Sequence, residues 1–96
     1  MTFTLPLEGM KVLDFTQMMA GPFCTMLLAD MGADVAKIEK PGGGDDIRQA
    51  GPPFIAGESA AFLAINRNKR SVVLDLKSEA GVAAVRHMVR GADVLV

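Results

Sequence analysis

Apolar runs and turn residues along the N-terminal part of the chain follow the order strand, helix, strand. Lys11 to Phe15 form a short apolar run typical of a buried parallel strand. After a loop over residues 16–20, Gly21-Pro22 opens a helix that extends to about Met31. This helix is apolar nearly all round, so we expect it to be covered on most sides. Residues 34–39 supply a second strand, and the order predicts a βαβ unit with a right-handed crossover.

A stretch rich in glycine and proline separates this unit from the rest of the chain. Pro41 to Gly57 has the composition of a long loop rather than of a packed element, and long ordered loops are often functional. Ser59 is placed to cap a short helix. The apolar residues of that helix that we expect to face inward are Phe62, Leu63 and Ile65.

The C-terminal part shows the strand–helix–strand order again, without an internal sequence repeat. Residues 66–70 form a polar, basic turn, and the alternating pattern of residues 71–76 predicts a third strand. The last helix has the clearest signals, with Ser78 at its cap, one valine-rich face and Gly91 at its end. A fourth strand begins at Asp93 to Val96, so the fold class is α/β with a parallel sheet.

The chain of 96 residues is long enough for one small domain or a piece of one. The final apolar strand lacks a polar closing segment, and a parallel sheet needs further elements to cover it. We therefore interpret residues 1–96 as the N-terminal part of an α/β domain of a longer protein. The net charge of −1 gives no field that would attract nucleic acid or an anionic membrane.

The chain has one cysteine and one histidine, which excludes an internal disulfide and a structural zinc site built from these residue types. Its start lacks the basic and apolar regions of a signal peptide. The longest uncharged run, Phe15 to Ala29, is broken by Gly21-Pro22 and is shorter than the roughly 20 residues of a spanning helix. We therefore expect a cytoplasmic protein with no metal site and no membrane segment.

The loop after the first strand lies where open α/β sheets bind their ligands, at the carboxyl ends of the strands. Backbone N–H groups at Gly21 to Phe23 are placed to face an anion, although Pro22 removes one donor, and a simple tight turn fits equally well. The three spaced glycines of the dinucleotide fingerprint are absent, and Glu39 alone is a weak signal for ribose binding. We therefore expect no nicotinamide cofactor.

Cationic residues gather at the entry to the third strand and at the end of the second. Arg67, Lys69 and Arg70 lie close together in sequence, and Lys40 is expected on the same side of the sheet. Phosphate groups suit such a convergence, while a solvated basic turn explains the same composition. Because no aromatic residue lies among these cations, a phosphorylated small molecule is favoured over nucleic acid.

Other reactive side chains have simpler interpretations. Cys24 lies inside the apolar helix and is expected to be a buried hydrophobic residue rather than a nucleophile. His87 is expected to be exposed on the last helix. The Met18-Met19 pair favours an adaptable wall for a ligand over a filler of core gaps. Asp45-Asp46, on a glycine-rich loop, favours a solvated turn over a carboxylate pair.

A series of motifs follows in one order along essentially the whole chain. The first ones are Leu7-Glu8-Gly9, Val12 to Thr16, Ala20-Gly21-Pro22-Phe23, Leu28 to Val35, and Lys37-Ile38-Glu39. The later ones are Gly44-Asp45, Asn66 to Ser71, Leu74 to Lys77, and Ala92-Asp93-Val94. As a set they resemble the start of the family III CoA-transferases, the group of formyl-CoA transferase, carnitine CoA-transferase and α-methylacyl-CoA racemase.

The resemblance implies a Rossmann-like α/β domain, a much longer full chain and a homodimer of two interlocked subunits. A CoA thioester would be the substrate, with no tightly bound cofactor. Lys40 would make a single-point phosphate contact where several relatives carry Arg. The CoA-binding positions of the family fall on Met19, Ala20, Lys40 and, along the third strand, Leu74, Asp75, Leu76 and Lys77.

The family mechanism that the resemblance implies uses an aspartate carboxylate, which attacks the acyl-CoA and passes through a mixed anhydride and an enzyme-bound thioester. In relatives this aspartate lies beyond residue 96, so no acid of this chain is assigned its role. The long loop Pro41 to Ser59 favours a transferase that acts on an acyl-CoA and a carboxylic acid. An acyl-CoA racemase, with downstream acid and base groups, and a non-catalytic binding fragment are the alternatives.

Overall fold

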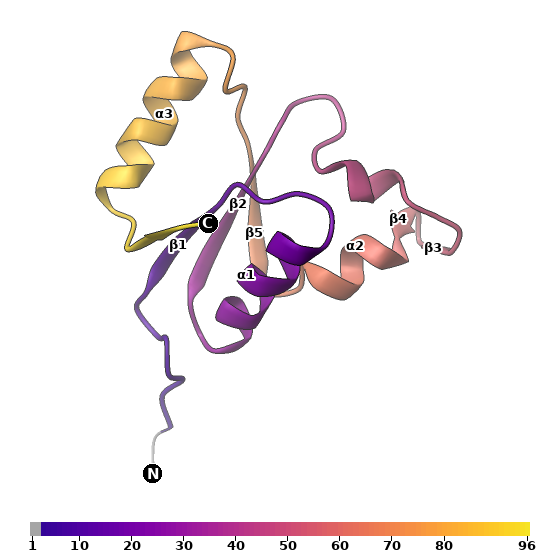
Figure 1. Cartoon of the computed structure of the whole chain (residues 1–96), viewed down its shortest axis with the longest axis horizontal. Helices are drawn as coiled ribbons and strands as arrows, with labels where there is room; N and C mark the ends of the chain where they lie inside the picture. Colours follow the sequence, from indigo (N-terminus) through magenta and orange to yellow (C-terminus); the bar gives the residue numbers. More distant parts are fainter. Residues whose placement is uncertain (1–2) are drawn as a thin grey trace.

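The computed structural model describes residues 3–96 and contains a parallel sheet of strand order β5-β2-β1-β6 (Figure 1). The elements are β1 (Lys11–Asp14), α1 (Ala20–Asp30), β2 (Asp34–Glu39), the 3-10 helix η1 (Asp46–Gln49), β3 (Phe54–Ile55), β4 (Glu58–Ser59), α2 (Ala60–Ile65), β5 (Lys69–Val73), α3 (Glu79–Arg90) and β6 (Val94–Leu95). All pairs within this sheet are parallel. The order matches the first four strands of a Rossmann sheet, which confirms the predicted fold class.

The β1–α1–β2 unit forms the core and confirms the predicted crossover unit. Val12 and Val35 point to one face of the sheet, where Ala29 and Ala33 pack against them. Helix α1 begins at Ala20, slightly earlier than predicted, so that Pro22 lies in the first turn, where its missing N–H is tolerated.

Strand β5 begins at Lys69, not at Ser71 as predicted, and it ends at Val73. Leu74 to Lys77 therefore follow the strand instead of forming part of it. Leu74 still continues the hydrogen bonding between β5 and β2, because its N–H donates to the Glu39 carbonyl at 2.9 Å. The prediction was wrong because charged residues at the strand entry indicated a turn, whereas the Lys69 side chain is buried against α1.

The stretch Pro41 to Gly57 is not an unpacked loop. It contains η1, whose Ile47 is buried, and the first strand of the antiparallel hairpin β3–β4. The Asp45 side chain caps η1 by accepting from the Ile47 N–H at 3.1 Å. As predicted, Ser59 caps α2, accepting from the Phe62 N–H at 3.3 Å, but Leu63 is exposed rather than inward-facing.

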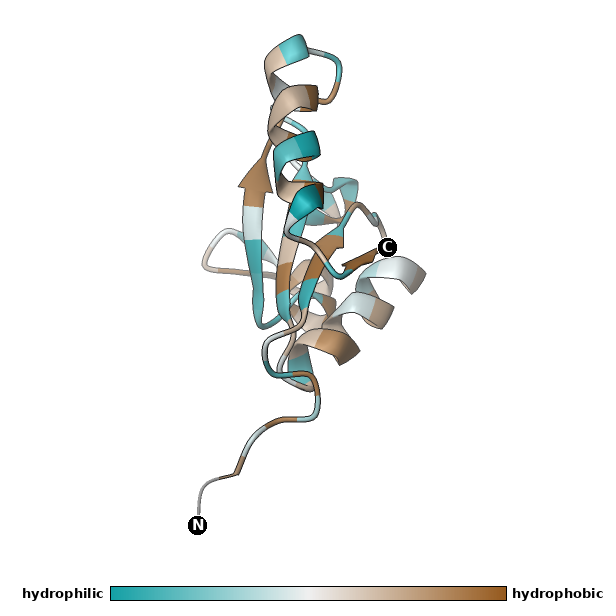
Figure 2. Ribbon diagram, turned by 90° about the vertical axis from the view of Figure 1, so that its left-hand side faces the viewer, coloured by the Kyte–Doolittle hydropathy of each residue, from teal (hydrophilic) through white to brown (hydrophobic). Residues whose placement is uncertain are grey.

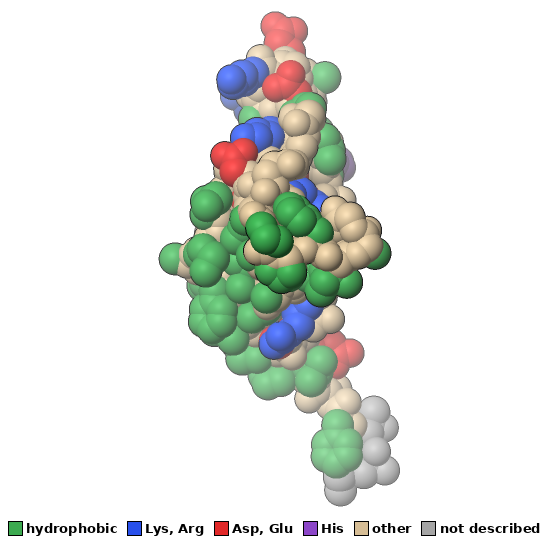
Figure 3. Space-filling model, turned by 90° about the vertical axis from the view of Figure 1, so that its right-hand side faces the viewer, with side chains coloured by type: hydrophobic (Ala, Val, Ile, Leu, Met, Phe, Trp, Pro, Cys, Tyr) green, Lys and Arg blue, Asp and Glu red, His purple; other side chains and the backbone are tan. Residues whose placement is uncertain are grey.

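Apolar side chains remain exposed on α1, α2 and the hairpin. Figure 3 shows them gathered on the face formed by the hairpin and α2; this face includes Phe54, Ile55 and Leu63. On α1, Phe23 and Leu27 are about half exposed, and Cys24 is exposed as well. The expectation of a helix covered on most sides, with a buried cysteine, is therefore wrong for the described residues. The covering layer that the sequence pattern indicates does not come from residues 3–96.

Helix α3 lies beside the sheet, on the face opposite α1 (Figure 2). Its predicted ends are confirmed, with the Ser78 hydroxyl accepting from the Gly81 N–H at 3.0 Å and Gly91 at the other end. Leu13 of β1 and Met88 of α3 line a cleft of about 260 Å³ between helix and sheet. His87 is exposed, as predicted. Within the part of the chain described, no helix combines the length and apolar character needed to cross a membrane.

In the first turn of α3 we expect alanine to be less stable than glycine, the reverse of the usual order in a helix. Alanine normally stabilises a helix interior by about 1 kcal/mol relative to glycine. A Cβ at Gly81 would overlap the Asp75 carbonyl oxygen, so we expect Gly81→Ala to lower the free energy of unfolding by about 1–3 kcal/mol. Urea denaturation measures this, with Ala83→Gly on the exposed side of the helix as the control for propensity alone. A more stable Gly81→Ala protein would contradict the close contact.

Candidate functional site

The candidate site lies at the carboxyl edge of the sheet. From β1 the chain proceeds outward to β2 and β5, and it then returns to β6 on the other side of β1. Ligands of open α/β sheets bind outside the carboxyl ends of the strands near such a reversal of strand order. The segments that follow β1, β2 and β5 leave the sheet at this edge and form the candidate site.

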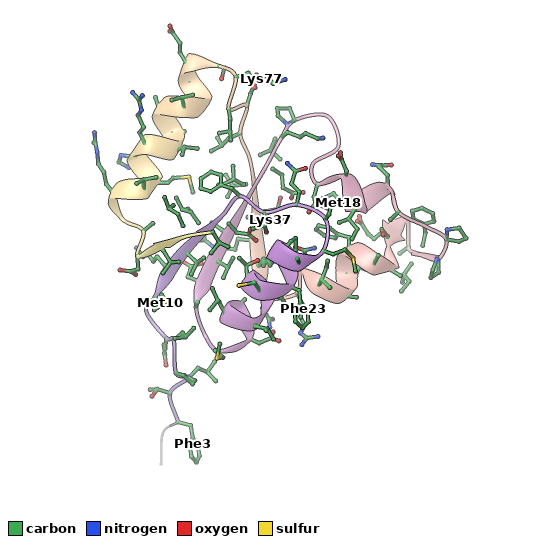
Figure 4. The ribbon with its side chains drawn as sticks, in the orientation of Figure 1. Phe3, Met10, Met18, Phe23, Lys37 and Lys77 are labelled. Atoms are coloured by element: carbon green, nitrogen blue, oxygen red, sulfur yellow. The ribbon has the colours of Figure 1, made fainter. Side chains whose placement is uncertain are left out.

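A cleft of about 140 Å³ lies between these segments. It brings together Lys40 after β2 and the segment Leu74 to Lys77 after β5, which the sequence placed in one site. Phe15 and Gln17 complete it from the loop after β1. In Figure 4, Lys77 stands beyond the end of β5, where the chain leads into α3.

Met19 and Ala20 do not line this cleft and lie at the start of α1. Met18 and Met19 are 49% and 58% exposed. Their contact with a ligand stays a prediction.

Lys40 carries its charge at the surface of the cleft. Its Nζ donates to Asp46 Oδ1 at 2.6 Å, and both side chains are more than half exposed. Ion pairs between exposed side chains contribute between zero and about 1 kcal/mol. A phosphate group can therefore replace the Asp46 carboxylate at little cost.

The basic residues at the entry to β5 do not converge with Lys40. Arg67 makes a two-pronged contact with Asp30, its Nη2 lying 2.7 Å from Oδ2. Arg70 pairs in the same way with Asp34, at the first residue of β2 and so at the opposite edge of the sheet from Lys40. The expected convergence of these residues with Lys40 is therefore wrong, because Arg67 and Arg70 each pair with a carboxylate at the amino edge and Lys69 is buried against Asp14.

A buried ion pair that the sequence analysis missed joins β2 to the segment after it. The Lys37 Nζ lies 2.8 Å from Asp45 Oδ2, and the two side chains are 2% and 0% exposed. Asp45 was expected in a solvated turn, and that expectation is wrong. Burial by itself raises the pKa of Asp45, but the Lys37 ammonium and the N–H groups of Ile47 and Met18 outweigh it and lower the pKa below its ordinary value.

A second buried pair anchors the loop after β1. Asp14 accepts hydrogen bonds from the Thr25 hydroxyl at 2.7 Å and from the Thr16 N–H at 2.8 Å, and Lys69 lies 3.1 Å away. Burial opposes ionisation of Asp14, yet hydrogen bonds from Thr16 and Thr25 hold its pKa below the ordinary value. Burial also lowers the pKa of Lys69, against the attraction of Asp14.

Glu39 is fully engaged in a third pair and is not free to bind ribose. Arg48 donates to both of its carboxylate oxygens, at 2.7 Å each, and the Ser71 hydroxyl and the Asp45 N–H donate as well. The Arg48 guanidinium also lies over the Phe62 ring, 3.8 Å from its centroid. Burial raises the pKa of Glu39, but these donors prevail and hold it at about 2.

A sequence signal for these pairs exists. Lys37 and Glu39 are alternate residues of β2, on the same side as the core residue Val35, so they point to the same face, toward α1. Charged residues in such positions are almost never buried unless they are paired. The sequence does not show which residues pair with them. In the described range 3–96, no cluster of three metal-ligating side chains is present.

Residues 7–96, nearly the whole chain, match the family described as CoA-transferase family III. The chain belongs to CoA-transferase family III.

Curated relatives within this group are named as CoA-transferases. The human succinyl-CoA:glutarate CoA-transferase is 50% identical over 91 residues, which are 95% of this chain and 21% of that protein. The acetyl-CoA:oxalate CoA-transferase of Acetobacter aceti is 48% identical over 90 residues, 94% of this chain and 23% of that protein. This family III chain thus spans less than a quarter of the length of these relatives.

Solved structures of the family share the fold. A CAIB/BAIF family protein from Brucella suis superposes with a TM-score of 0.91 at 45% sequence identity. The match covers 97% of this chain and 25% of that protein. The parallel sheet and its helices therefore correspond to one part of a larger family III structure.

The Glu39–Arg48 pair predicts acid sensitivity. The folded-state pKa of Glu39, about 2, lies below its unfolded value of about 4.3. The carboxylate therefore stabilises the fold above the unfolded pKa, and this stabilisation, about 3 kcal/mol, is lost as the pH falls toward 2. We expect Glu39→Gln to flatten the dependence of the free energy of unfolding on pH between 5 and 2, measured by urea titrations. Glu58→Gln, which changes the exposed partner of Arg48 at 3.8 Å, serves as control and keeps the slope.

Proposed function

We propose that this chain is the N-terminal, CoA-holding part of a longer protein that transfers CoA from an acyl-CoA to a carboxylic acid. The observation that carries the proposal is the cleft at the carboxyl edge, where Lys40 meets Leu74 to Lys77. Family membership and the names of the relatives support the reaction class.

Within the cleft, Lys40 would contact a phosphate of CoA in place of Asp46. Leu74 and Leu76 supply apolar surface, and Lys77 supplies a second positive charge. Met19 and Ala20, at the start of α1, would meet another part of the same long ligand. A cleft of 140 Å³ holds only part of a CoA molecule, so the rest of the site is proposed to come from outside residues 1–96.

The chemistry that we propose for the longer protein is nucleophilic. An aspartate carboxylate attacks the thioester carbonyl, which forms a mixed anhydride and releases the CoA thiolate. The thiolate attacks the aspartyl carbonyl of the anhydride, which releases the first acid and leaves an enzyme-bound thioester. The acceptor carboxylate repeats the two steps in reverse order, and the aspartate is regenerated. Asp14, Glu39 and Asp45 are unsuited to this role, because each is buried and engaged in an ion pair.

The partners that we propose are an acyl-CoA and a carboxylic acid as substrates, and further protein over the exposed apolar surfaces. Exposed apolar patches mark interaction sites in soluble proteins. Phe54, Ile55 and Leu63 on the face in Figure 3, and Phe23 and Leu27 on α1, are such surfaces. The remainder of the longer chain and a second, interlocked subunit are the proposed cover.

The role of Lys40 is tested in the product of the full reading frame. We expect Lys40→Ala to weaken CoA binding by about 1–3 kcal/mol, because a charge-assisted phosphate contact is lost. The Michaelis constant for the acyl-CoA donor measures this. Asp46→Ala is the matched control: it removes only the competing carboxylate, so we expect the constant to stay equal or to fall. An unchanged constant in Lys40→Ala would argue for a solvated turn.

The proposed position of the nucleophile, outside residues 1–96, gives a second prediction. We expect the purified 96-residue chain alone to show no CoA transfer, because the proposed nucleophile lies outside it. Transfer of CoA from labelled succinyl-CoA to a panel of carboxylic acids is the measurement, with the full-length product as the positive control. Turnover by the isolated chain would refute the assignment of the nucleophile, and inversion at the α-carbon of an acyl-CoA by the full-length product would establish the racemase alternative.

A further inference from the structure

The loop between β1 and α1 is held by buried side chains on both sides of Gln17. The Thr16 N–H donates to Asp14 at 2.8 Å, and the Thr16 carbonyl accepts from the Lys37 ammonium at 2.9 Å. On the other side, the Met18 N–H donates to Asp45 Oδ1 at 3.1 Å. Gln17 itself lines the cleft at the carboxyl edge. The residue presented to the cleft thus lies between two backbone positions that are fixed by charged groups.

The two charged groups come from different segments and depend on one another. Lys37 belongs to β2, whereas Asp45 follows that strand, and Nζ and Oδ2 lie 2.8 Å apart. In Figure 4, the loop that carries Met18 passes by Lys37, whose Nζ donates to the Thr16 carbonyl. The Asp45 N–H donates to Glu39 Oε1 at 2.9 Å, so the Glu39–Arg48 pair fixes Asp45 in turn.

The backbone of the loop needs these contacts. Met18 has φ of 71°, a left-handed conformation that costs a residue other than glycine on the order of 1 kcal/mol or more. A loop released from its partners would relax toward the ordinary range of φ. Gly21 also lies against the Thr16 side chain without room for a Cβ, which fixes the path from the loop into α1.

Stability alone gives little reason for a buried ion pair here. Removing two charges from water is costly, and replacement of such pairs by apolar residues is often neutral or stabilising. In this structure, however, both groups also bond to the backbone of the same loop: Lys37 donates to the Thr16 carbonyl, and Asp45 accepts from the Met18 N–H as well as from the Ile47 N–H of η1. Charge-assisted hydrogen bonds are about twice as strong as neutral ones, which suits a contact that must hold a strained conformation.

We propose that Lys37 and Asp45 form a positioning pair that holds Thr16 to Met18 in the conformation that presents Gln17 to the CoA cleft. The effect on binding rests on the proposed function; the effect on the loop does not. Neither residue touches the cleft, so both act through the loop. If the loop is loosened, only a fraction of molecules is competent to bind, and the apparent affinity for the thioester falls by that fraction.

The experiment uses the full-length product and three variants. Asp45→Ala removes the acceptor of the Met18 N–H, whereas Asp45→Asn keeps an oxygen in that place. The double variant Lys37→Met with Asp45→Asn is neutral and of nearly equal volume, so it tests the loop where a lone buried charge would prevent folding. Arg67→Met is the matched control, because it breaks an ion pair with Asp30 at the amino edge, away from the loop.

We expect the Michaelis constant for the acyl-CoA donor to rise about tenfold in Asp45→Ala and several-fold in the double variant, with kcat changed less than threefold. In Asp45→Asn the rise in the Michaelis constant should be smaller than in Asp45→Ala. In Arg67→Met the Michaelis constant should stay within twofold of the wild-type value. A fall in melting temperature with an unchanged Michaelis constant in Asp45→Ala and in the double variant would overturn the proposal, because a merely structural pair gives that result.

Hydrogen exchange in the ligand-free protein separates this inference from the proposed function. We expect exchange of the Met18 amide to accelerate at least tenfold in Asp45→Ala and to stay unchanged in Arg67→Met. If exchange accelerates in Asp45→Ala but the wild-type protein transfers no CoA, the positioning pair is supported and only the proposed function is refuted. Protection of the Met18 amide equal to that of the wild type in Asp45→Ala would overturn the positioning pair even in an active enzyme.

Discussion

The structure depends on the pairing of charged side chains buried between the sheet and the segments packed on its α1 side. Asp14, Lys37, Glu39 and Lys69 all point to this face, and each meets an opposite charge there. A buried charge without a partner would destabilise the fold. Each segment that supplies a partner must therefore stay next to the charge with which it pairs. The apolar core under α1 is small, and these pairs determine where the loops at the carboxyl edge lie.

The two edges of the sheet use charge differently. At the amino edge, Arg67 and Arg70 make exposed pairs with carboxylates, and such pairs contribute little to stability. At the carboxyl edge, the Lys37–Asp45 pair is buried and bonds to loop backbone, whereas Lys40 keeps an exposed, exchangeable partner. The carboxyl edge thus combines loops that are held by buried pairs with a surface cation whose partner is easily exchanged. This combination suits the binding of a charged ligand.

The order of the parallel strands and the three α-helices and the helix caps at Ser59 and Ser78 were predictable, because they depend on local patterns of apolar, capping and turn residues; η1 and the β3–β4 hairpin were missed. The meeting of Lys40 with Leu74 to Lys77 was predictable only through the family resemblance. The burial of Lys69 and Asp45 was not predictable, because their partners are distant in sequence. The exposure of Cys24 was also missed, since the apolar pattern of α1 indicates a cover that residues 3–96 do not provide.

The sequence by itself determined the four strands of the parallel sheet and the three α-helices, because backbone preference and apolar periodicity act over a few residues. It also placed charged residues at alternate positions of β2, which requires that they be paired. The tertiary structure alone decided which charge meets which, and hence which cations are neutralised at the amino edge and which backbone groups are held at the carboxyl edge. The physical reason is that electrostatic pairing depends on distance in space and on exclusion of water, and neither is encoded in the spacing of residues along the chain.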